Sequence, residues 1–274
     1  MPLVPPRIGV PVAAHPHIHY PAAGGATSGM IELEAVRKVY PDGQVALNGV
    51  SLSVERGTTL ALLGPSGCGK TTTLKIINRL LDPTAGRVRI DGRDSAGLDP
   101  IRLRRGMGYV VQDAGLFPHL TALDNVEIVP RLLGWPRARR GARARELFAL
   151  MGLDSAELGG RYPSQLSGGQ RQRVGLARAL AADPPIVLMD EPFGALDPIT
   201  RRRLQEEFLT LKVRLRKTVV LVTHDVEEAF RLADRIAVMD RGTAVQVGTP
   251  DEIRATPASP FVAAFVAKRA APPT

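Results

Sequence analysis

The sequence contains one cysteine, Cys68, and no long apolar run. A single cysteine excludes a disulfide within the chain, so a reducing compartment is the expected environment. Apolar runs such as residues 59–63 and 185–189 are far shorter than the roughly 20 residues that cross a bilayer. We therefore expect a soluble chain that meets a membrane only at its surface.

Aromatic residues make up only 4% of the chain, although its formal net charge is +9. Such a charge suits a nucleic-acid ligand, an anionic membrane surface, or a genome that uses arginine freely. The basic residues are spread over residues 102–105, 137–145 and 201–203, with few aromatic side chains between them to stack on bases. No nucleic-acid partner is therefore expected.

The chain has 274 residues, 44% of them hydrophobic, which is enough for one domain with a sizeable core. Residues 1–29 are rich in Pro, Ala, Gly and His, and they lack both an apolar period and the apolar segment of a secretory signal. We predict a disordered tail there, a folded domain over residues 30–266 and a C-terminal tail over residues 267–274. No metal site is expected from the tail histidines, His15, His17 and His19.

Strands and helices alternate along most of the folded part. A helix over residues 197–215 is the clearest, because Asp197 suits its N-cap and Pro198 its first turn. Residues 121–180 have helical spacing and no convincing strand, which predicts an inserted helical subdomain at about 113–182. Alternating strands and helices predict a mainly parallel α/β sheet. The predicted strands are residues 30–36, 51–54, 58–63, 87–90, 108–111, 186–189, 219–222 and 236–239.

A phosphate-binding loop, G-x-x-x-x-G-K-[ST], follows one of these strands and precedes a helical pattern over residues 72–81. Its glycines let backbone N–H groups face phosphates, Lys70 neutralises β/γ charge, and the Thr71 hydroxyl suits Mg²⁺. The nearby helix N-terminus and Lys70 both favour the thiolate of Cys68, but a small filler at a variable loop position is the preferred interpretation of this residue. The predicted nucleotide contacts here are Gly64, Pro65, Ser66, Gly67, Cys68, Gly69, Lys70, Thr71 and Thr72.

Two acids and a histidine follow other apolar strands. Asp190 ends one strand and suits a magnesium ion, while Glu191 follows it and suits the polarisation of an attacking water. His224 comes after another strand, where it can hydrogen-bond a γ-phosphate. Because ligands bind at the carboxyl ends of parallel strands, we predict Glu191, His224 and Lys70 as catalytic residues.

A second phosphate cradle precedes the helical pattern of residues 171–181. The segment Leu166-Ser167-Gly168-Gly169-Gln170, called the signature segment below, places Ser-Gly-Gly at a helix N-terminus. The sequence here resembles the ATP-binding cassette (ABC) family, whose signature is LSGGQ, and the resemblance extends over about residues 31–266. Ser167, Gly168, Gly169 and Gln170 are thereby implied as nucleotide contacts.

The resemblance implies a P-loop NTPase cassette of the α/β class. Such a cassette has a RecA-like, mainly parallel sheet core, an antiparallel β subdomain and an inserted α-helical subdomain. It also implies roles for further residues. Tyr40 matches the aromatic that stacks on adenine, Gln112 the glutamine that touches Mg²⁺, and Asp197 the loop that crosses to a partner subunit, with Ala195 where many members have Ser. The implied cofactors are ATP and Mg²⁺, with Thr71, Gln112 and Asp190 at the metal.

The family resemblance also implies partners. Two subunits, identical or paired, would join head to tail, so that Lys70, Thr71 and Gln112 of one face Ser167 and Gly169 of the other. Transmembrane permease subunits would dock on the segment after Gln112, where residues 116–118 and Trp135 offer apolar anchors. The alternative for these residues is packing in the core of the helical insertion. A solute-binding protein would act through the permease. The expected location is the cytoplasmic side of the cell membrane, as a peripheral subunit.

Three segments, residues 75–80, 115–119 and 129–135, look most like the glycine betaine, choline and carnitine importer branch. Many relatives in that branch continue into a paired regulatory domain, whereas this sequence ends at Thr274, so regulation within it is not expected. Alternatives are an importer subunit for another solute such as amino acids, and a cassette ATPase that acts on nucleic acid or the ribosome. An ATP-binding regulator without turnover is disfavoured because Lys70, Asp190, Glu191 and His224 are all present.

Overall fold

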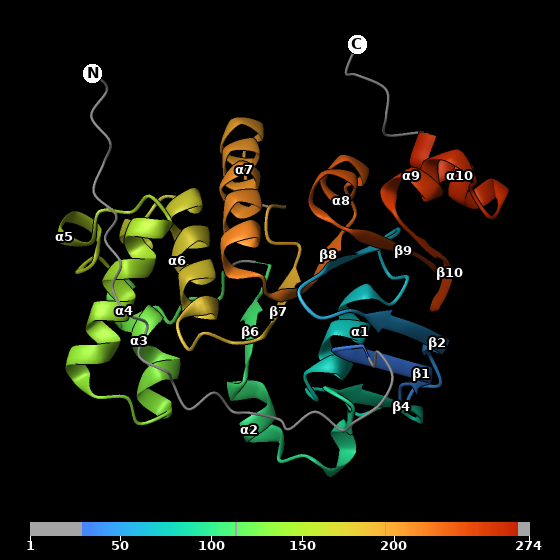
Figure 1. Ribbon diagram of the computed structural model, residues 1–274, viewed down its shortest axis with the longest axis horizontal. Helices are drawn as coiled ribbons and strands as arrows, with labels where there is room; N and C mark the ends of the chain where they lie inside the picture. The colour runs from blue at the N-terminus through green and yellow to red at the C-terminus, as the bar shows by residue number, and fades with distance from the viewer. Residues whose placement is uncertain (1–28, 113, 195, 268–274) are drawn as a thin grey trace, which may run out of the picture.

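The computed structural model describes residues 29–112, 114–194 and 196–267. They form two sheets and a group of helices (Figure 1). The strands are β1 (Ile31–Val39), β2 (Val45–Val54), β3 (Thr59–Leu63), β4 (Ala85–Ile90), β5 (Arg93–Asp94), β6 (Met107–Val110), β7 (Ile186–Asp190), β8 (Thr218–Thr223), β9 (Arg235–Asp240) and β10 (Thr243–Gly248). The α-helices are α1 (Lys70–Ile77), α2 (Pro100–Arg105), α3 (Ala122–Leu132), α4 (Arg137–Leu150), α5 (Ser155–Leu158), α6 (Gly168–Leu180), α7 (Pro198–Leu215), α8 (Val226–Leu232), α9 (Pro250–Ala255) and α10 (Pro260–Ala267).

The central sheet has the strand order β10-β9-β3-β8-β7-β6. All its neighbouring strands run parallel except β10, which is antiparallel to β9. Every residue of β3, β7 and β8 is buried, as expected for parallel strands covered on both faces. The prediction of a mainly parallel α/β sheet is confirmed.

A separate antiparallel sheet, with the order β2-β1-β4-β5, lies beside α1. Its core face shares one apolar cluster with α1, which includes Ile31 and Leu33 of β1 and Leu74 and Ile77 of the helix. The turn between β9 and β10 ties this sheet to the phosphate loop, because Gly242 N donates to Cys68 O and Gly242 O accepts from Asn48 N. The antiparallel subdomain is thereby fixed against the loop.

The helices α3 to α6 lie between β6 and β7 in the chain and gather at one side of the molecule (Figure 1). All of residues 121–180 are described and none forms a strand, as predicted. Phe148 and Leu147 of α4 and Val174 of α6 are fully buried in one apolar cluster. Within the described part of the chain, no helix combines the length and apolarity needed to span a membrane.

Several predicted boundaries were wrong. The helix expected over residues 72–81 spans Lys70–Ile77, and Arg79 just beyond it has a left-handed φ of 54°. The strand expected over residues 51–54 is only the end of β2, because bulges between β1 and β2 break the alternating pattern. The short helices α2, α8, α9 and α10 and the strand β10 were not predicted. At the chain ends, Gly29 is described, Ala267 closes α10, and the three tail histidines lie outside the described residues.

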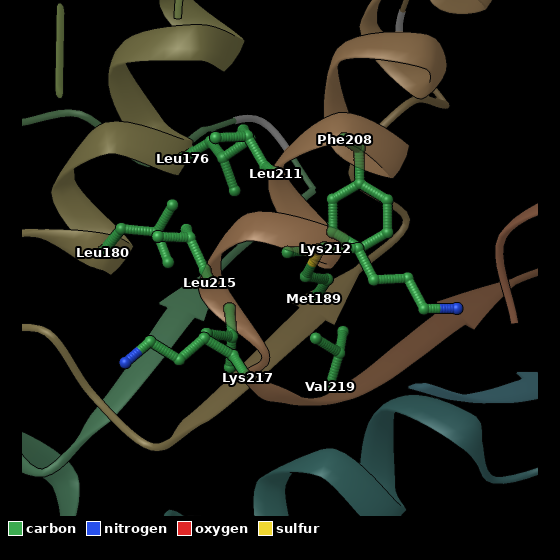
Figure 2. A pocket seen from close by; sticks show the side chains of 10 residues that line it. Leu176, Leu180, Met189, Phe208, Leu211, Lys212, Leu215, Lys217 and Val219 are labelled. Carbon is green, nitrogen blue, oxygen red and sulfur yellow. The ribbon is translucent and has the colours of Figure 1, made fainter. Parts of the chain in front are cut away.

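A small apolar cavity of about 20 Å³, partly open to solvent, lies between α6, α7, β7 and β8 (Figure 2). Val219 of β8 points toward it, whereas the next residue, Val220, packs in the apolar cluster on the opposite face of the sheet. The rim lysines Lys212 and Lys217 form ion pairs with Asp234 and Asp183, each at 2.8 Å. The cavity is therefore a packing defect of the core, bordered by charges that are already paired.

We predict that Val219→Ile stabilises the fold. The extra methylene would fill part of the cavity, and burying one contributes roughly 0.8 kcal/mol. The control is Val220→Ile, which adds the same group to a side chain that is 0% exposed in a filled cluster and should destabilise by roughly 1–3 kcal/mol. Denaturant unfolding of both variants tests this, and equal effects of the two substitutions would contradict it.

Candidate functional site

The predicted active residues gather where four neighbouring parallel strands end. The strands β3, β8, β7 and β6 are adjacent in the central sheet, and their carboxyl ends share one edge (Figure 1). The phosphate loop follows β3, His224 follows β8, Asp190 ends β7, and Gln112 follows β6. Side chains from distant parts of the chain are thus placed together by the strand order alone.

The phosphate loop is compact and leaves no room for larger residues at two glycines. A Cβ on Gly64 would lie 2.3 Å from Met239 O, and one on Gly69, whose φ is 107°, would lie 2.6 Å from Leu47 Cδ2. The Lys70 ammonium is buried and donates to Gly64 O at 2.7 Å and to Pro65 O at 2.8 Å. Ser66 and Gly67 are exposed at the tip of the loop. The loop therefore presents a cation and a helix N-terminus to an incoming phosphate.

Thr71 and Asp190 meet at the start of α1. The Thr71 hydroxyl donates to Asp190 Oδ1 at 3.0 Å, although the two residues are far apart in sequence. Burial raises the pKa of Asp190, while the hydrogen bond from Thr71 opposes this shift. A hydroxyl and a carboxylate oxygen side by side are the ligands that Mg²⁺ prefers. The residues present fit a magnesium ion at this point.

Glu191 lies at the centre of a second group. His224 Nδ1 is 3.2 Å from Glu191 Oε1, and Gln112 Nε2 donates to Glu191 Oε2 at 3.3 Å. The backbone of Glu191 has a φ of 46°, which is unfavourable for a residue with a side chain. Its N–H donates to Val222 O of β8, at 3.0 Å. The strand neighbour therefore holds the acid in a strained position, as is common at functional sites.

Tyr40 lies in the loop between β1 and β2, close to the phosphate loop. Its hydroxyl is 3.4 Å from the Thr72 hydroxyl, and the Lys38 ammonium lies 5.8 Å from its ring centroid. The ring is partly exposed beside the first turn of α1. This position suits an aromatic platform for a nucleotide base next to the phosphate cradle.

The signature segment forms the N-terminus of α6, on a different part of the molecule. Ser167 Oγ accepts from Gln170 N at 3.2 Å, and Ser167 N donates to Gln170 Oε1 at 2.8 Å, so the two residues form a capping box. Ser167 and Gly168 are exposed, and a Cβ on Gly169 would lie 2.8 Å from Thr200 Cγ2 of α7. Figure 1 shows α6 and α1 with β6, β7 and α7 between them. The chain does not bring its two cradles together.

Asp197 caps α7 beside the signature segment. Its carboxylate accepts from Ile199 N and Thr200 N, and the bond from Thr200 holds the pKa of Asp197 below its usual range. Ala195 lies outside the described residues. Arg201 on the same helix donates to Phe193 O and Leu196 O, which ties these two residues to α7. Arg201 of α7 thus holds described residues next to the loop that is expected to cross to the partner subunit.

Burial decides between the two interpretations of Cys68. Its side chain is 3% exposed, and burial raises the pKa of the thiol, although the Lys70 charge opposes the shift. A thiolate is therefore disfavoured, because the cost of placing a charge in this buried position exceeds the attraction of Lys70. The thiol acts as a small apolar filler beneath the loop.

The structure adds residues that the motifs did not single out. Arg178 of α6 donates to Ala114 O and Gly115 O, just after Gln112. Asn125 of α3 is fully buried and holds the backbone around Phe117 through four hydrogen bonds. No local pattern marks these side chains, because their partners are backbone groups of other segments.

A strand, a glycine-rich loop and a helix N-terminus in this order, on a mainly parallel sheet, define a P-loop nucleotide-binding fold. Residues 47–194 match the ABC transporter family. Among solved structures, the dimeric structure of a bacterial ABC transporter cassette has a TM-score of 0.73 and 40% identity, and the match covers 81% of this chain and 99% of that one. The dimeric post-hydrolysis state of a cassette bound to ADP and Pi has a TM-score of 0.72 and 39% identity over the same shares. The chain belongs to the ABC transporter family.

Several curated proteins are also similar. The glycine betaine/carnitine/choline transport ATP-binding protein of Bacillus subtilis is 55% identical over 239 residues, which is 87% of this chain and 63% of that protein. The choline transport ATP-binding protein of Bacillus subtilis is 55% identical over 239 residues, which is 87% of this chain and 62% of that protein. The glycine betaine uptake system ATP-binding protein of Escherichia coli is 50% identical over 236 residues, 86% of this chain and 76% of that protein. The chain thus spans less than two thirds of the length of the first two.

Glu228, on α8 just after His224, is a buried acid. It is 4% exposed, and its Oε2 accepts from Gln205 Nε2 of α7 at 3.3 Å. Burial raises the pKa of Glu228 from 4.5 to about 7, hydrogen bonding to Thr223 opposes the shift, and the Asp225 charge adds to it. The carboxyl therefore takes up a proton more readily in the folded protein than in the unfolded chain.

We predict that this acid makes stability pH-dependent. Because its pKa is higher in the folded state, its contribution is present at low pH and is lost as pH rises from 4.5 through about 7. Glu228→Gln does not titrate, so its stability relative to the parent should rise by on the order of 2 kcal/mol between about pH 5 and 8. Urea unfolding at several pH values measures this, with the exposed neighbour Glu227→Gln as control. A difference that stays constant with pH would contradict the prediction.

Proposed function

We propose that this chain is the ATP-hydrolysing subunit of an ABC importer, and that it acts as a pair of subunits on the cytoplasmic side of the cell membrane. The observation that carries the proposal is the convergence of Lys70, Thr71, Asp190, Glu191 and His224 at one sheet edge. This arrangement supplies a phosphate cradle, a pair of metal ligands and a base with a polar partner. The names of the similar proteins, which are ATP-binding subunits of transport systems, support transport over an action on nucleic acid.

In this proposal the chain's own groups divide the work of hydrolysis. The phosphate loop and Lys70 bind and orient the β- and γ-phosphates, and Glu191 accepts a proton from the attacking water. His224 holds the Glu191 carboxylate from one side and Gln112 from the other. A magnesium ion held by Thr71, Asp190 and Gln112 would neutralise charge on the phosphate oxygens.

Two subunits are needed because the cradles of one chain are apart. The exposed N-terminus of α6, with Ser167 and Gly168, lies apart from the Lys70 site of its own chain and would face the Lys70 site of a second subunit. Gly169, Gln170 and Asp197 would lie at the same interface. The dimeric cassettes to which this chain is similar support this pairing.

The permease would dock on the segment after Gln112. Phe117 is 43% exposed and stands beside His119, with ring centroids 6.0 Å apart, while Leu132 of α3 is 52% exposed. Trp135 is half-buried, with the Arg139 guanidinium 3.7 Å from its ring centroid, so Phe117 is the better anchor. Such exposed apolar side chains on the segments that follow Gln112 suit a membrane subunit that responds to nucleotide state.

For the solute we propose a quaternary amine osmoprotectant such as glycine betaine, choline or carnitine, delivered by a solute-binding protein. The support is the similarity to subunits named for these solutes, at 50 to 55% identity. An importer subunit for another solute, such as an amino acid, is the alternative. No residue of this chain is expected to touch the solute.

We predict that Glu191→Gln binds ATP and hydrolyses it on the order of 100-fold more slowly, because the amide keeps the shape of the side chain and loses the base. The closed pair of subunits should then accumulate with Mg-ATP. Size-exclusion chromatography and phosphate release measure both effects. The control is Glu227→Gln, an exposed substitution outside the site. Parent-like turnover of Glu191→Gln would show that another group is the base.

We predict that deletion of the gene impairs uptake of labelled glycine betaine, choline or carnitine, most clearly under osmotic stress. Complementation with Phe117→Asp should restore little uptake, because a charge in an apolar contact costs on the order of 2 kcal/mol or more. ATP binding by the isolated variant should remain. Val213→Asp, which changes a side chain 77% exposed on α7, is the matched control and should complement fully.

Different outcomes would reject the solute, the docking surface or the ATPase function. Normal uptake of all three amines in the deletion strain, with loss of another solute, would reject the substrate and keep the transporter. Full complementation by Phe117→Asp would reject the docking surface alone. An isolated chain that binds no ATP would reject the function as a whole.

A further inference from the structure

Arg178 joins the two functional segments of the helical part. It lies on α6, the helix that begins at the signature segment, and its guanidinium reaches the turn after Gln112. Nη1 donates to Gly115 O at 2.6 Å and Nη2 donates to Ala114 O at 2.7 Å. These are short, charge-assisted hydrogen bonds; the bond to Ala114 O is partly buried, and the bond to Gly115 O is exposed.

The two accepting carbonyls lie on unusual backbone. Ala114 has a φ of 58° and Gly115 a φ of 51°, and only glycine adopts this left-handed region freely. A Cβ on Gly115 would lie 2.4 Å from Val111 Cγ2, so the turn is tight. Ala114 N donates to Val111 O at 3.0 Å, which closes it. The conformation of Ala114 therefore depends on contacts from outside the turn.

Those contacts come from one helix. Ala114 is 1% exposed, and a Cβ on Gly175 of α6 would lie only 3.1 Å from its Cβ. Gly175 thus lets α6 approach closely, and Arg178, three residues further on, closes the contact. Arg173 of the same helix points elsewhere and pairs with Glu207 of α7 at 3.0 Å.

We propose that Arg178 is a positioning residue that makes the turn after Gln112 move as one body with the signature helix. The inference rests on the proposed function, in which Gln112 serves the nucleotide of its own subunit and the signature segment serves that of the partner. Arg178 then links the two nucleotide sites within one chain. Closing of one site would bias the other, which is a coupling between sites.

The test compares Arg178→Gln with the parent in steady-state ATP hydrolysis. The parent should show a Hill coefficient above 1, up to about 2 for two coupled sites. Arg178→Gln should lower it toward about 1 and lower kcat on the order of 10-fold, while KM changes little. Arg173→Gln, on the same helix, should keep the parent Hill coefficient. If Arg173→Gln lowers it equally, the effect belongs to the helix in general and the inference is overturned.

A second substitution distinguishes the effect of Arg178 on the conformation of Ala114 from its effect on the coupling between the two nucleotide sites. Ala114→Gly accepts the left-handed conformation without help, so in the Arg178→Gln background it should recover much of kcat. The Hill coefficient should stay low, because the link to α6 is still cut. Arg178→Lys keeps the charge but cannot span both carbonyls, and it should give an intermediate Hill coefficient. Recovery of the Hill coefficient by Ala114→Gly would overturn the proposed coupling.

Hydrogen exchange on the nucleotide-free chain tests the inference without relying on hydrolysis. The Ala114 amide should lose protection in Arg178→Gln and Arg178→Lys, while the amides of α6 keep theirs. Unchanged protection of Ala114 in both variants would overturn the inference, even in an active ATPase. A parent that does not hydrolyse ATP would overturn the proposed function, and the loss of protection would still support the role of Arg178 in the turn.

Discussion

The arrangement of β3, β8, β7 and β6 is the constraint on which the rest of the site depends. These strands are neighbours and run parallel, so their carboxyl ends open onto the same edge. The runs of β3, β7 and β8 are buried on both faces, so a slip in register would disrupt their close packing against the covering elements. Two bonds depend on that register: Thr71 to Asp190, and the Glu191 amide to Val222 O. The chemistry at the edge therefore follows from hydrophobic burial in the sheet.

The carboxyl ends of these strands supply only half of a nucleotide site. The other phosphate cradle is the capped N-terminus of α6, held at a distance from α1 by the sheet and α7. The Ser167 hydroxyl caps the amide of Gln170, while Ser167 and Gly168 are exposed at the helix N-terminus. A helix N-terminus of this kind attracts an anion, and in the proposed function it faces the phosphate loop of a second copy or a paired subunit. In the proposed function, the separation of the cradles makes hydrolysis depend on how two subunits meet.

The sequence predicted those parts of the structure whose cause is local. Apolar runs predicted β3, β7 and β8, and the phosphate loop, Asp190 and His224 could be placed because each follows such a run. The start of α7 followed from Asp197 and Pro198. The extent of β2 was missed because bulges interrupt its alternation. Arg178, Asn125 and Glu228 could not be predicted to matter, because their partners come from other elements. The buried Cys68 shows the same limit, since burial there outweighs Lys70.

The contacts around Gln112 indicate whether it moves with the central sheet or with the signature helix α6. On one side its amide donates to Glu191 Oε2 at 3.3 Å, a single bond between two side chains. On the other side the chain runs into Ala114, whose carbonyl and that of Gly115 are held by Arg178 at 2.7 and 2.6 Å. Two short bonds from a partly buried guanidinium outweigh one longer bond at a solvent-exposed residue. When the signature helix moves, Gln112 should therefore follow α6 and part from Glu191, so the weak bond is the point where the two bodies separate.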